Sequence, residues 1–273
     1  MNSPPPSARS GVRSARSARY AVAIFLSSSL LFLLEPIAAK RLLPLLGGSA
    51  AVWTACLVFF QCALLLGYAT AHWIAGIRDG RTQATTYVAL LAASLLQLWL
   101  AVSAHPTADP ARPISSVLWL LAILIGVPFV TLSATSPLLQ AWFARAVSAG
   151  ESATPAQPYR LFAISNVGSL ISLLVYPWLI EPRFTLHGQM VALGGWFTIL
   201  AIVCGAIAWS IAGLPAAALA ANAAPAESIG SSVSEESRPW AWIALAACGS
   251  LLLSAVTIHL SQNVATIPLL WII

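Results

Sequence analysis

The sequence predicts an all-α integral membrane protein, a polytopic bundle of helices. Of its 273 residues, 59% are hydrophobic and only 8% are charged, whereas about a quarter of the residues in a soluble domain are charged. Apolar runs long enough to cross a hydrocarbon core of ~30 Å recur along the chain. Open sheets leave unpaired backbone groups that lipid cannot satisfy, so we expect every run to be a helix.

Seven apolar runs are candidates for membrane spans. They cover residues 20–46, 50–74, 84–103, 114–143, 161–180, 190–213 and 240–260. Residues 214–239 are rich in Ala, Ser, Pro and Glu without apolar periodicity, which is typical of a flexible linker. The expected plan is a disordered basic tail over 1–19, a six-helix bundle over 20–213, a cytoplasmic linker over 214–239 and a seventh membrane helix over 240–273.

The N-terminal tail is rich in Pro, Ser and Arg and lacks acidic residues. A transit peptide has the same composition, and the tail with the first apolar run also imitates a signal peptide cleaved near Ala39. We favour an uncleaved anchor, because Ile37 is a poor residue for such a cleavage site and later spans need a first span to orient them. The formal charge of +5 does not indicate a nucleic-acid partner, since four of the thirteen basic residues cluster before the first span, namely Arg9, Arg13, Arg16 and Arg19.

The distribution of basic residues predicts a cytoplasmic N-terminus in the inner membrane. This orientation puts nine basic residues inside and four outside, as the positive-inside rule favours. The outer four are Lys40, Arg41, Arg112 and Arg183. Lys40 and Arg41 are the exception that weakens this assignment.

Glu35 interrupts the first apolar run, just before Pro36. A helix ending at Leu34 would have 15 residues from Tyr20 and measure about 22 Å, too short to cross. The helix must therefore continue through Glu35 and Pro36. Five residues separate Glu35 from Lys40, about 140° around a straight helix, so these two would pair directly only across a kink. Glu35 either faces the bundle interior or snorkels to the outer interface with Lys40 and Arg41, and the sequence favours neither.

The fourth apolar run carries an unusual density of polar and proline residues. Either the helix is broken to line a cavity, as in transporters, or its hydroxyls bond back to the preceding turn across two harmless kinks, which we favour. The residues concerned are Pro128, Thr131, Ser133, Thr135, Ser136, Pro137 and Gln140.

Two later runs carry further candidate polar sites. In the fifth, Ser165, Ser169 and Ser172 with Gly168 form a stripe of small residues that favours helix packing, while Asn166 could instead reach a ligand. In the seventh, a cluster favours a polar pocket over helix–helix hydrogen bonding. It consists of His259, Gln262 and Asn263.

The sequence predicts no metal site and no cofactor. A single intramembrane histidine does not make a metal site. The four cysteines lie singly in apolar runs, without the paired spacing of a zinc site or a disulfide framework. They are Cys56, Cys62, Cys204 and Cys248.

The loop "GIRDGR" between the second and third runs places Gly76, Arg78, Asp79 and Arg81 at the cytoplasmic face. It resembles a degenerate form of the loop after the second helix in the major facilitator superfamily, where an Asp and Arg residues tie neighbouring helices together. Six spans, a hydrophilic linker and a new span also fit that superfamily's plan of two six-helix halves. The resemblance implies a major-facilitator-like N-terminal half plus one further helix.

A more specific resemblance covers the chain from the first span to its end. The chain is similar to a bacterial family of fused major-facilitator and spermidine-synthase proteins. The strings that carry the similarity are "LLEPIAAKRLLPLLGGSAAVW", "FFQCALLLGYATAH", "LSATSPLLQAWFAR", "YRLFAISNVGSLISLLVYPWLIEP" and "HLSQNVATIPLLW". In that family, more helices follow and then a domain resembling aminopropyltransferases, which move an aminopropyl group from decarboxylated S-adenosylmethionine to putrescine.

The sequence contains no glycine-rich nucleotide loop with downstream acids and no acid pair placed to deprotonate a diamine. We therefore expect an incomplete piece of a longer design that does not synthesise spermidine by itself. Our leading hypothesis is a membrane module that anchors a synthase-like domain encoded downstream and passes a small polar or cationic solute toward it. The alternative is a half-transporter that pairs with another chain. An enzyme in its own right is disfavoured because no catalytic constellation is evident.

Overall fold

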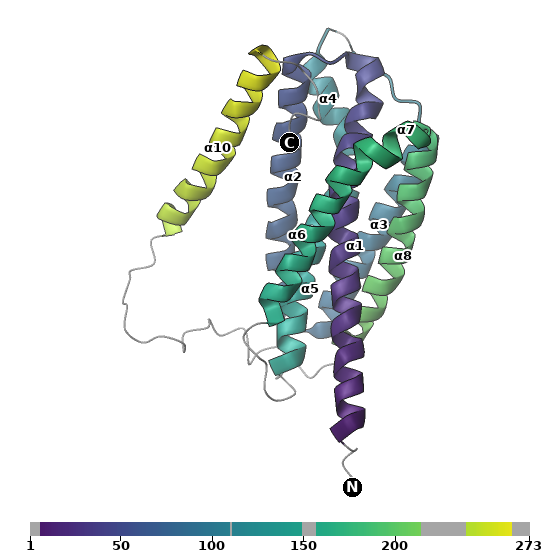
Figure 1. The fold of residues 1–273 in the computed structure, drawn as a ribbon, viewed down its shortest axis with the longest axis vertical. Helices are drawn as coiled ribbons and strands as arrows, with labels where there is room; N and C mark the ends of the chain where they lie inside the picture. The colour runs from purple at the N-terminus through teal and green to yellow at the C-terminus, as the bar shows by residue number, and fades with distance from the viewer. Residues whose placement is uncertain (1–5, 110, 149–156, 214–238, 264–273) are drawn as a thin grey trace.

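A computed structural model describes residues 6–109, 111–148, 157–213 and 239–263. Every regular element in this part of the chain is helical (Figure 1). Six helical stretches are long and apolar enough to cross a membrane. They are Ser17–Leu46, Ala50–Gly76, Gly80–Ser103, Pro113–Arg145, Arg160–Arg183 and Leu186–Ala212. The chain is thus a multi-pass helical protein, and the first six predicted spans are confirmed as helices of spanning length.

The first span belongs to α1 (Pro6–Leu46), a helix of 41 residues. Residues 6–19, expected as part of a disordered tail, are helical, while residues 1–5 lie outside the described part. That expectation was wrong for 6–19 because proline is tolerated in the first helical turn and the following Ala and Arg residues favour helix. The prediction that the helix continues past Glu35 is confirmed, since Pro36 and Pro44 both lie inside α1.

Short turns with recognisable caps connect the spans. Gly47 ends α1 with a φ of 72°, a backbone conformation that favours glycine. Ser49 then caps α2 (Ala50–Gly76) by accepting a hydrogen bond from the Val52 N–H. Asp79 caps α3 (Gly80–Ser103), and Thr185 caps α8 (Leu186–Ala212), in the same way. These caps fix where each span begins.

Two spans contain a short π-helical segment next to a proline. The fourth span runs as α4 (Pro113–Leu121), η1 (Ala122–Gly126) and α5 (Val127–Ser148), with Pro128 just after η1. The fifth runs as α6 (Gln157–Val175), η2 (Tyr176–Ile180) and α7 (Glu181–Arg183), with Pro177 inside η2. Proline removes a backbone donor and leaves a carbonyl to be satisfied elsewhere.

Gln97 on α3 satisfies the backbone at η1. Its amide nitrogen donates to the carbonyls of Ala122 at 2.8 Å and Ile123 at 2.5 Å, and its Oε1 accepts from the Val127 N–H at 2.9 Å. A neighbouring helix therefore stabilises this irregularity, as membrane spans require.

The contacts between spans have an internal symmetry. The contact of α1 with α6 corresponds to the contact of α2 with α4 and α5. The contact of α1 with α8 corresponds in the same way to the contact of α3 with α5. α3 also packs against α8, and α1 against α5. Exchanging spans one to three with spans four to six leaves this pattern unchanged. Because each unit has three crossings, the second unit enters the membrane from the opposite side to the first.

Glycines mark the two equivalent crossings. A Cβ on Gly67 of α2 would lie 2.8 Å from the Val130 carbonyl of α5, and one on Gly168 of α6 would lie 2.9 Å from the Phe25 carbonyl of α1. The Ser29 hydroxyl of α1 also donates to the Gly168 carbonyl at 3.2 Å. The small residues of the fifth span thus include a glycine used for close helix approach.

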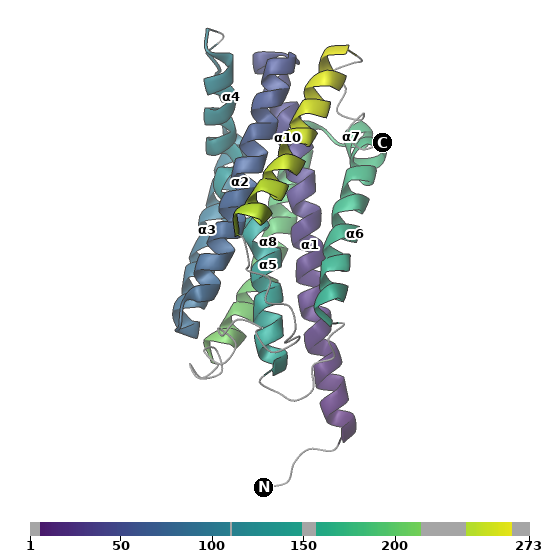
Figure 2. The same ribbon diagram turned by 90° about the vertical axis from the view of Figure 1, so that its left-hand side faces the viewer.

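The helix α10 (Pro239–Asn263) packs on the outside of α2. Figure 2 shows it crossing that face of the bundle at an angle. Its fully described apolar stretch, Ile243–Val256, is shorter than a membrane crossing, so the seventh span stays a prediction. The linker expected over 214–239 falls on residues 214–238, outside the described part, except for Pro239, which begins α10.

Candidate functional site

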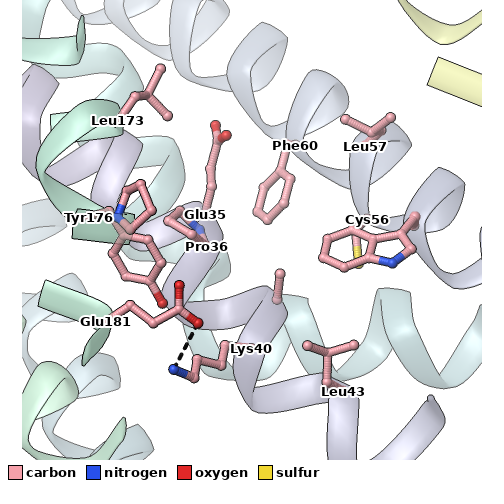
Figure 3. Close-up of a pocket in the computed structure, with 13 residues that line it drawn as sticks. Glu35, Pro36, Lys40, Leu43, Cys56, Leu57, Phe60, Leu173, Tyr176 and Glu181 are labelled. Atoms are coloured by element: carbon pink, nitrogen blue, oxygen red, sulfur yellow. Dashed lines mark hydrogen bonds and ion pairs between the residues drawn. The ribbon is translucent and has the colours of Figure 1, made fainter. Parts of the chain in front are cut away.

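A cavity of about 210 Å³ lies between α1, α2 and the α6–η2–α7 span. Its walls are largely apolar and aromatic, with a few polar groups, which is the usual composition of a small-ligand site. Figure 3 shows the lining residues. The charged and aromatic residues of the lining are Glu35, Lys40, Trp53, Phe60, Tyr176 and Glu181.

Glu35 faces this cavity, half-buried, from the last third of α1. Its carboxylate forms no hydrogen bond or ion pair with any described residue. In Figure 3 the side chain points toward Leu173 and Phe60, away from Lys40. An ionisable group at membrane depth is costly, so one without a protein partner is a candidate ligand contact.

A second polar atom in the cavity wall also lacks a partner. The Nε1 of Trp53 on α2 is buried and has no hydrogen-bond acceptor among the described residues. Buried indole N–H groups normally find an acceptor. The cavity therefore presents one unpaired acceptor group, Glu35, while the unpaired Trp53 donor is buried within its wall.

Lys40 forms an ion pair with Glu181 rather than with Glu35. Their Nζ and Oε1 atoms lie 3.0 Å apart, with side chains 35% and 43% exposed. The pair joins α1 to α7 where the cavity meets the surface (Figure 3). Arg41 points elsewhere and donates to the Ala104 carbonyl at 2.6 Å. Of Glu35, Lys40 and Arg41, only Glu35 is left without a partner in the described chain.

Sequence reasoning missed Glu181 as a member of this site. The available signal was the repeat of "LLEP", which contains Glu35, as "LIEP", which contains Glu181. The two tetrapeptides lie on α1 and on the η2–α7 segment, which the fold brings to the same cavity. Trp53, Phe60 and Tyr176 carry no comparable signal, because aromatic residues in apolar runs mostly face lipid or core.

Three other predicted intramembrane residues, whose side chains the structure describes, do not line this cavity. Gln140 on α5 donates to the Ser136 hydroxyl at 3.1 Å. Asn166 is exposed on α6, and His259 is exposed on α10. Gln262 and Asn263 lie on α10, but their side chains fall outside what the structure describes. Among the predicted residues whose side chains are described, the structure therefore brings together only Glu35 and Lys40.

The hydroxyls of the fourth span form a paired network instead of a cavity. Thr135 and Ser133 each donate to the carbonyl one turn earlier, at 2.7 Å. Across to α3, Thr135 pairs with Tyr87 and Thr131 with Ser94, both at 2.8 Å. The favoured interpretation, that these hydroxyls bond back to the preceding turn, holds for Ser133 and Thr135.

In the loop motif after α2, Asp79 is the residue whose side chain caps the next helix. Its carboxylate accepts from the Thr82 hydroxyl at 2.7 Å and from the Thr82 N–H at 2.9 Å. The hydrogen bond from the Thr82 hydroxyl is the main reason that the pKa of Asp79 lies below its ordinary value. Gly76, Arg78 and Arg81 are exposed, and the two arginine side chains form no hydrogen bond or ion pair with a neighbouring span in the described part of the chain.

The tie between neighbouring helices at this loop is made by residues that sequence reasoning missed. Gln83 of α3 donates to the Ile77 carbonyl at 2.5 Å, and its Oε1 accepts from the Trp142 indole of α5 at 2.7 Å. Arg145 of α5 donates to the Ala75 carbonyl at the end of α2 at 2.7 Å. A glutamine one turn after a helix-capping aspartate was the only sequence hint.

Metal-binding and cysteine chemistry add no further site. Within the described residues, no group of three or more His, Cys, Asp or Glu side chains is placed to hold a metal ion. All four cysteines are free, with Cys56 and Cys204 buried and Cys62 and Cys248 exposed.

Comparisons with known proteins find nothing similar to this chain. No protein-family model matches it, and neither a curated protein nor a solved structure is significantly similar.

Proposed function

We propose that this chain is a membrane module that binds a small organic cation in the cavity at Glu35 and passes it toward a synthase-like domain. The observation that carries the proposal is the unpaired carboxylate of Glu35 in a cavity with aromatic walls. A carboxylate held in an apolar site attracts an ammonium group, and neighbouring aromatic faces favour the same charge.

The charges around the cavity support a cationic ligand. Its lining contains two acids, Glu35 and Glu181, and one base, Lys40, so the formal charge is −1 when all three are ionised. Lys40 is already paired with Glu181. An incoming ammonium would therefore find Glu35 free, whereas an anion would find no free cation in the lining.

The internal symmetry of the bundle supports a transporter-like module. Two inverted three-helix units are a recurring plan in secondary transporters, and irregular helices near the midplane often border the binding site. Here η2 with Pro177 borders the cavity and carries Tyr176 into its wall. This arrangement is the basis for proposing a major-facilitator-like half from the fused synthase family, located in the inner membrane with a cytoplasmic N-terminus.

A half-transporter that pairs with another chain is the second candidate. It is favoured by polar groups that the six spans leave unsatisfied or facing outward. The Gln61 Nε2 of α2 is buried without a partner among the described residues, and Asn166 of α6 is exposed. A polar side chain facing lipid is costly, so a second helical unit packed against Asn166 would stabilise it.

The test is amine binding by the purified full chain. We expect an aliphatic diamine to bind, and an uncharged diol of equal length not to bind, in equilibrium dialysis with detergent-solubilised protein. Glu35→Gln removes the charge and keeps the shape, so the affinity should fall roughly 10- to 100-fold, the value of a charged hydrogen bond.

Asp109→Asn is the matched control for the loss of one acid. Asp109 is exposed in the loop after α3 and does not line the cavity. Its variant should bind the diamine like the wild type. Equal affinity of the wild type and Glu35→Gln, or binding of the diol as tight as that of the diamine, would refute the proposal.

A further inference from the structure

A second hollow lies on the outside of the bundle, between α3 and the end of α8. It has a volume of about 670 Å³ and a floor of small side chains. Ala84, Ala89 and Ala92 line it from α3, and Trp209 lines it from α8, with Arg81 at one end. It shares no lining residue with the cavity at Glu35.

The hollow opens on the outer surface of the bundle. Trp209 is 81% exposed and Val88 in the same lining is 43% exposed. Both lie on helices of membrane-spanning length. In a bilayer, the medium in contact with such a face is lipid, so the space between the two helices must be filled by acyl chains.

The length of the hollow matches one leaflet. Its lining runs along α3 from Arg81 to Ala92, which at 1.5 Å per residue is about 16 Å. Half of a ~30 Å hydrocarbon core is about 15 Å. A lipid chain lying along the alanines would therefore place its headgroup beside Arg81, where α3 begins.

The charges at this end favour an anionic headgroup. Arg81 is exposed, and Arg78 in the same loop is exposed as well. Asp79 opposes them, but its carboxylate already accepts two hydrogen bonds from Thr82. Two arginines against one acid leave a formal excess of one positive charge. Trp209 adds an exposed indole, the side chain typical of the membrane interface.

We propose that the hollow between α3 and α8 is a binding site for an anionic phospholipid. One acyl chain lies on the alanine floor, and the phosphate contacts the guanidinium of Arg81 near the indole of Trp209. This inference is independent of the proposed function, because it uses a different face of the molecule and a ligand of opposite charge.

The test is native mass spectrometry of the full chain released from detergent micelles. Phosphatidylglycerol and phosphatidylcholine with identical acyl chains are titrated separately. We expect one tightly retained phosphatidylglycerol, preferred about fivefold over phosphatidylcholine, which corresponds to about 1 kcal/mol for one arginine at the surface. Free glycerol phosphate should not displace it, because that competitor lacks the chains.

Two variants separate the headgroup from the chain. Arg81→Gln should bring the two lipids to parity, whereas Arg112→Gln, an exposed arginine outside the hollow, should leave the preference unchanged. Ala89→Phe fills the floor and should weaken retention of both lipids. Leu96→Phe adds bulk to an exposed position of α3 outside the hollow and should not.

Several results would overturn the proposal. Equal retention of both lipids by the wild type would remove the headgroup contact, and an equal effect of Arg81→Gln and Arg112→Gln would show only general charge attraction. Displacement by glycerol phosphate, or normal retention by Ala89→Phe, would show that the acyl chain is not held in the hollow. All four substitutions are at exposed positions, so size-exclusion profiles should match that of the wild type.

Discussion

Two groups of polar side chains lie within the membrane spans, and they differ in how completely they are paired. Between α3 and α5, Tyr87 pairs with Thr135, Ser94 with Thr131, and Gln83 with Trp142, at 2.7 to 2.8 Å. Between α1, α2 and α6, Glu35 and the Trp53 Nε1 have no partner in the described chain.

This difference separates two uses of polarity in a membrane protein. The α3–α5 network is buried and paired, so its hydrogen bonds hold the spans together. The polar groups at the cavity contribute no such bond, and their desolvation lowers stability. Under the proposed function, Glu35 is kept for a ligand, while the paired network maintains the bundle.

The largest expected effect concerns Gln83, which makes bonds to two helices. Gln83→Leu removes the acceptor of the Trp142 indole and the donor to the Ile77 carbonyl. Because both partners are left without their bond in an apolar setting, the free energy of unfolding should fall by about 2 kcal/mol. Thermal unfolding of the detergent-solubilised chain measures this change.

Gln61→Leu is the matched control, with the same substitution at an unpaired glutamine. The Gln61 amide nitrogen is buried without a partner among the described residues, so its removal should be neutral within ~0.5 kcal/mol or stabilising. If both variants lose stability equally, the pairing of a buried glutamine does not determine its contribution to stability, and the stabilising role of the paired network is refuted.

A smaller effect is expected for the ion pair at the mouth of the cavity. Lys40 and Glu181 are 35% and 43% exposed, so solvent screens their attraction. A double-mutant cycle with Lys40→Met and Glu181→Gln should give a coupling energy of about 0.2 to 1 kcal/mol. A coupling above ~2 kcal/mol would mean that the pair is a main support of the α1–α7 contact rather than a weak closure of the cavity.

Much of the architecture follows from local sequence signals. Apolar run length predicts the six spans, and the need to cross the bilayer predicts that α1 passes through Glu35 and Pro36. The turn residues Gly47, Ser49 and Asp79 act through their own backbone or the next turn. Such signals can be read in sequence because cause and effect lie within a few residues.

The site could be predicted only in part, because its geometry depends on distant contacts. Lys40 and Glu181 are 141 residues apart in the chain, and a sequence pattern does not show that α1 and α6 meet. The disorder expected for residues 6–19 was wrong because composition was weighed above helix propensity. The sequence favours hydroxyls of the fourth span that bond back to the preceding turn, as Ser133 and Thr135 do, but their pairing with α3 depends on distant contacts.

The smallest effect concerns Asp79, an exposed acid that is paired where Glu35 is not. The Thr82 hydroxyl holds the pKa of Asp79 below its ordinary value in the folded chain. The cap therefore stabilises the fold above the unfolded pKa, about 3.9, and this contribution is lost as the pH falls below that value. Asp79→Asn keeps a capping oxygen but does not titrate. It should match the wild type in thermal unfolding near neutral pH and lose less stability than the wild type toward ~pH 3. If stability falls with pH in parallel for the wild type and Asp79→Asn, protonation of Asp79 is not coupled to folding. The hydrogen bonds of this acid would then have no measurable effect on the pH dependence of stability.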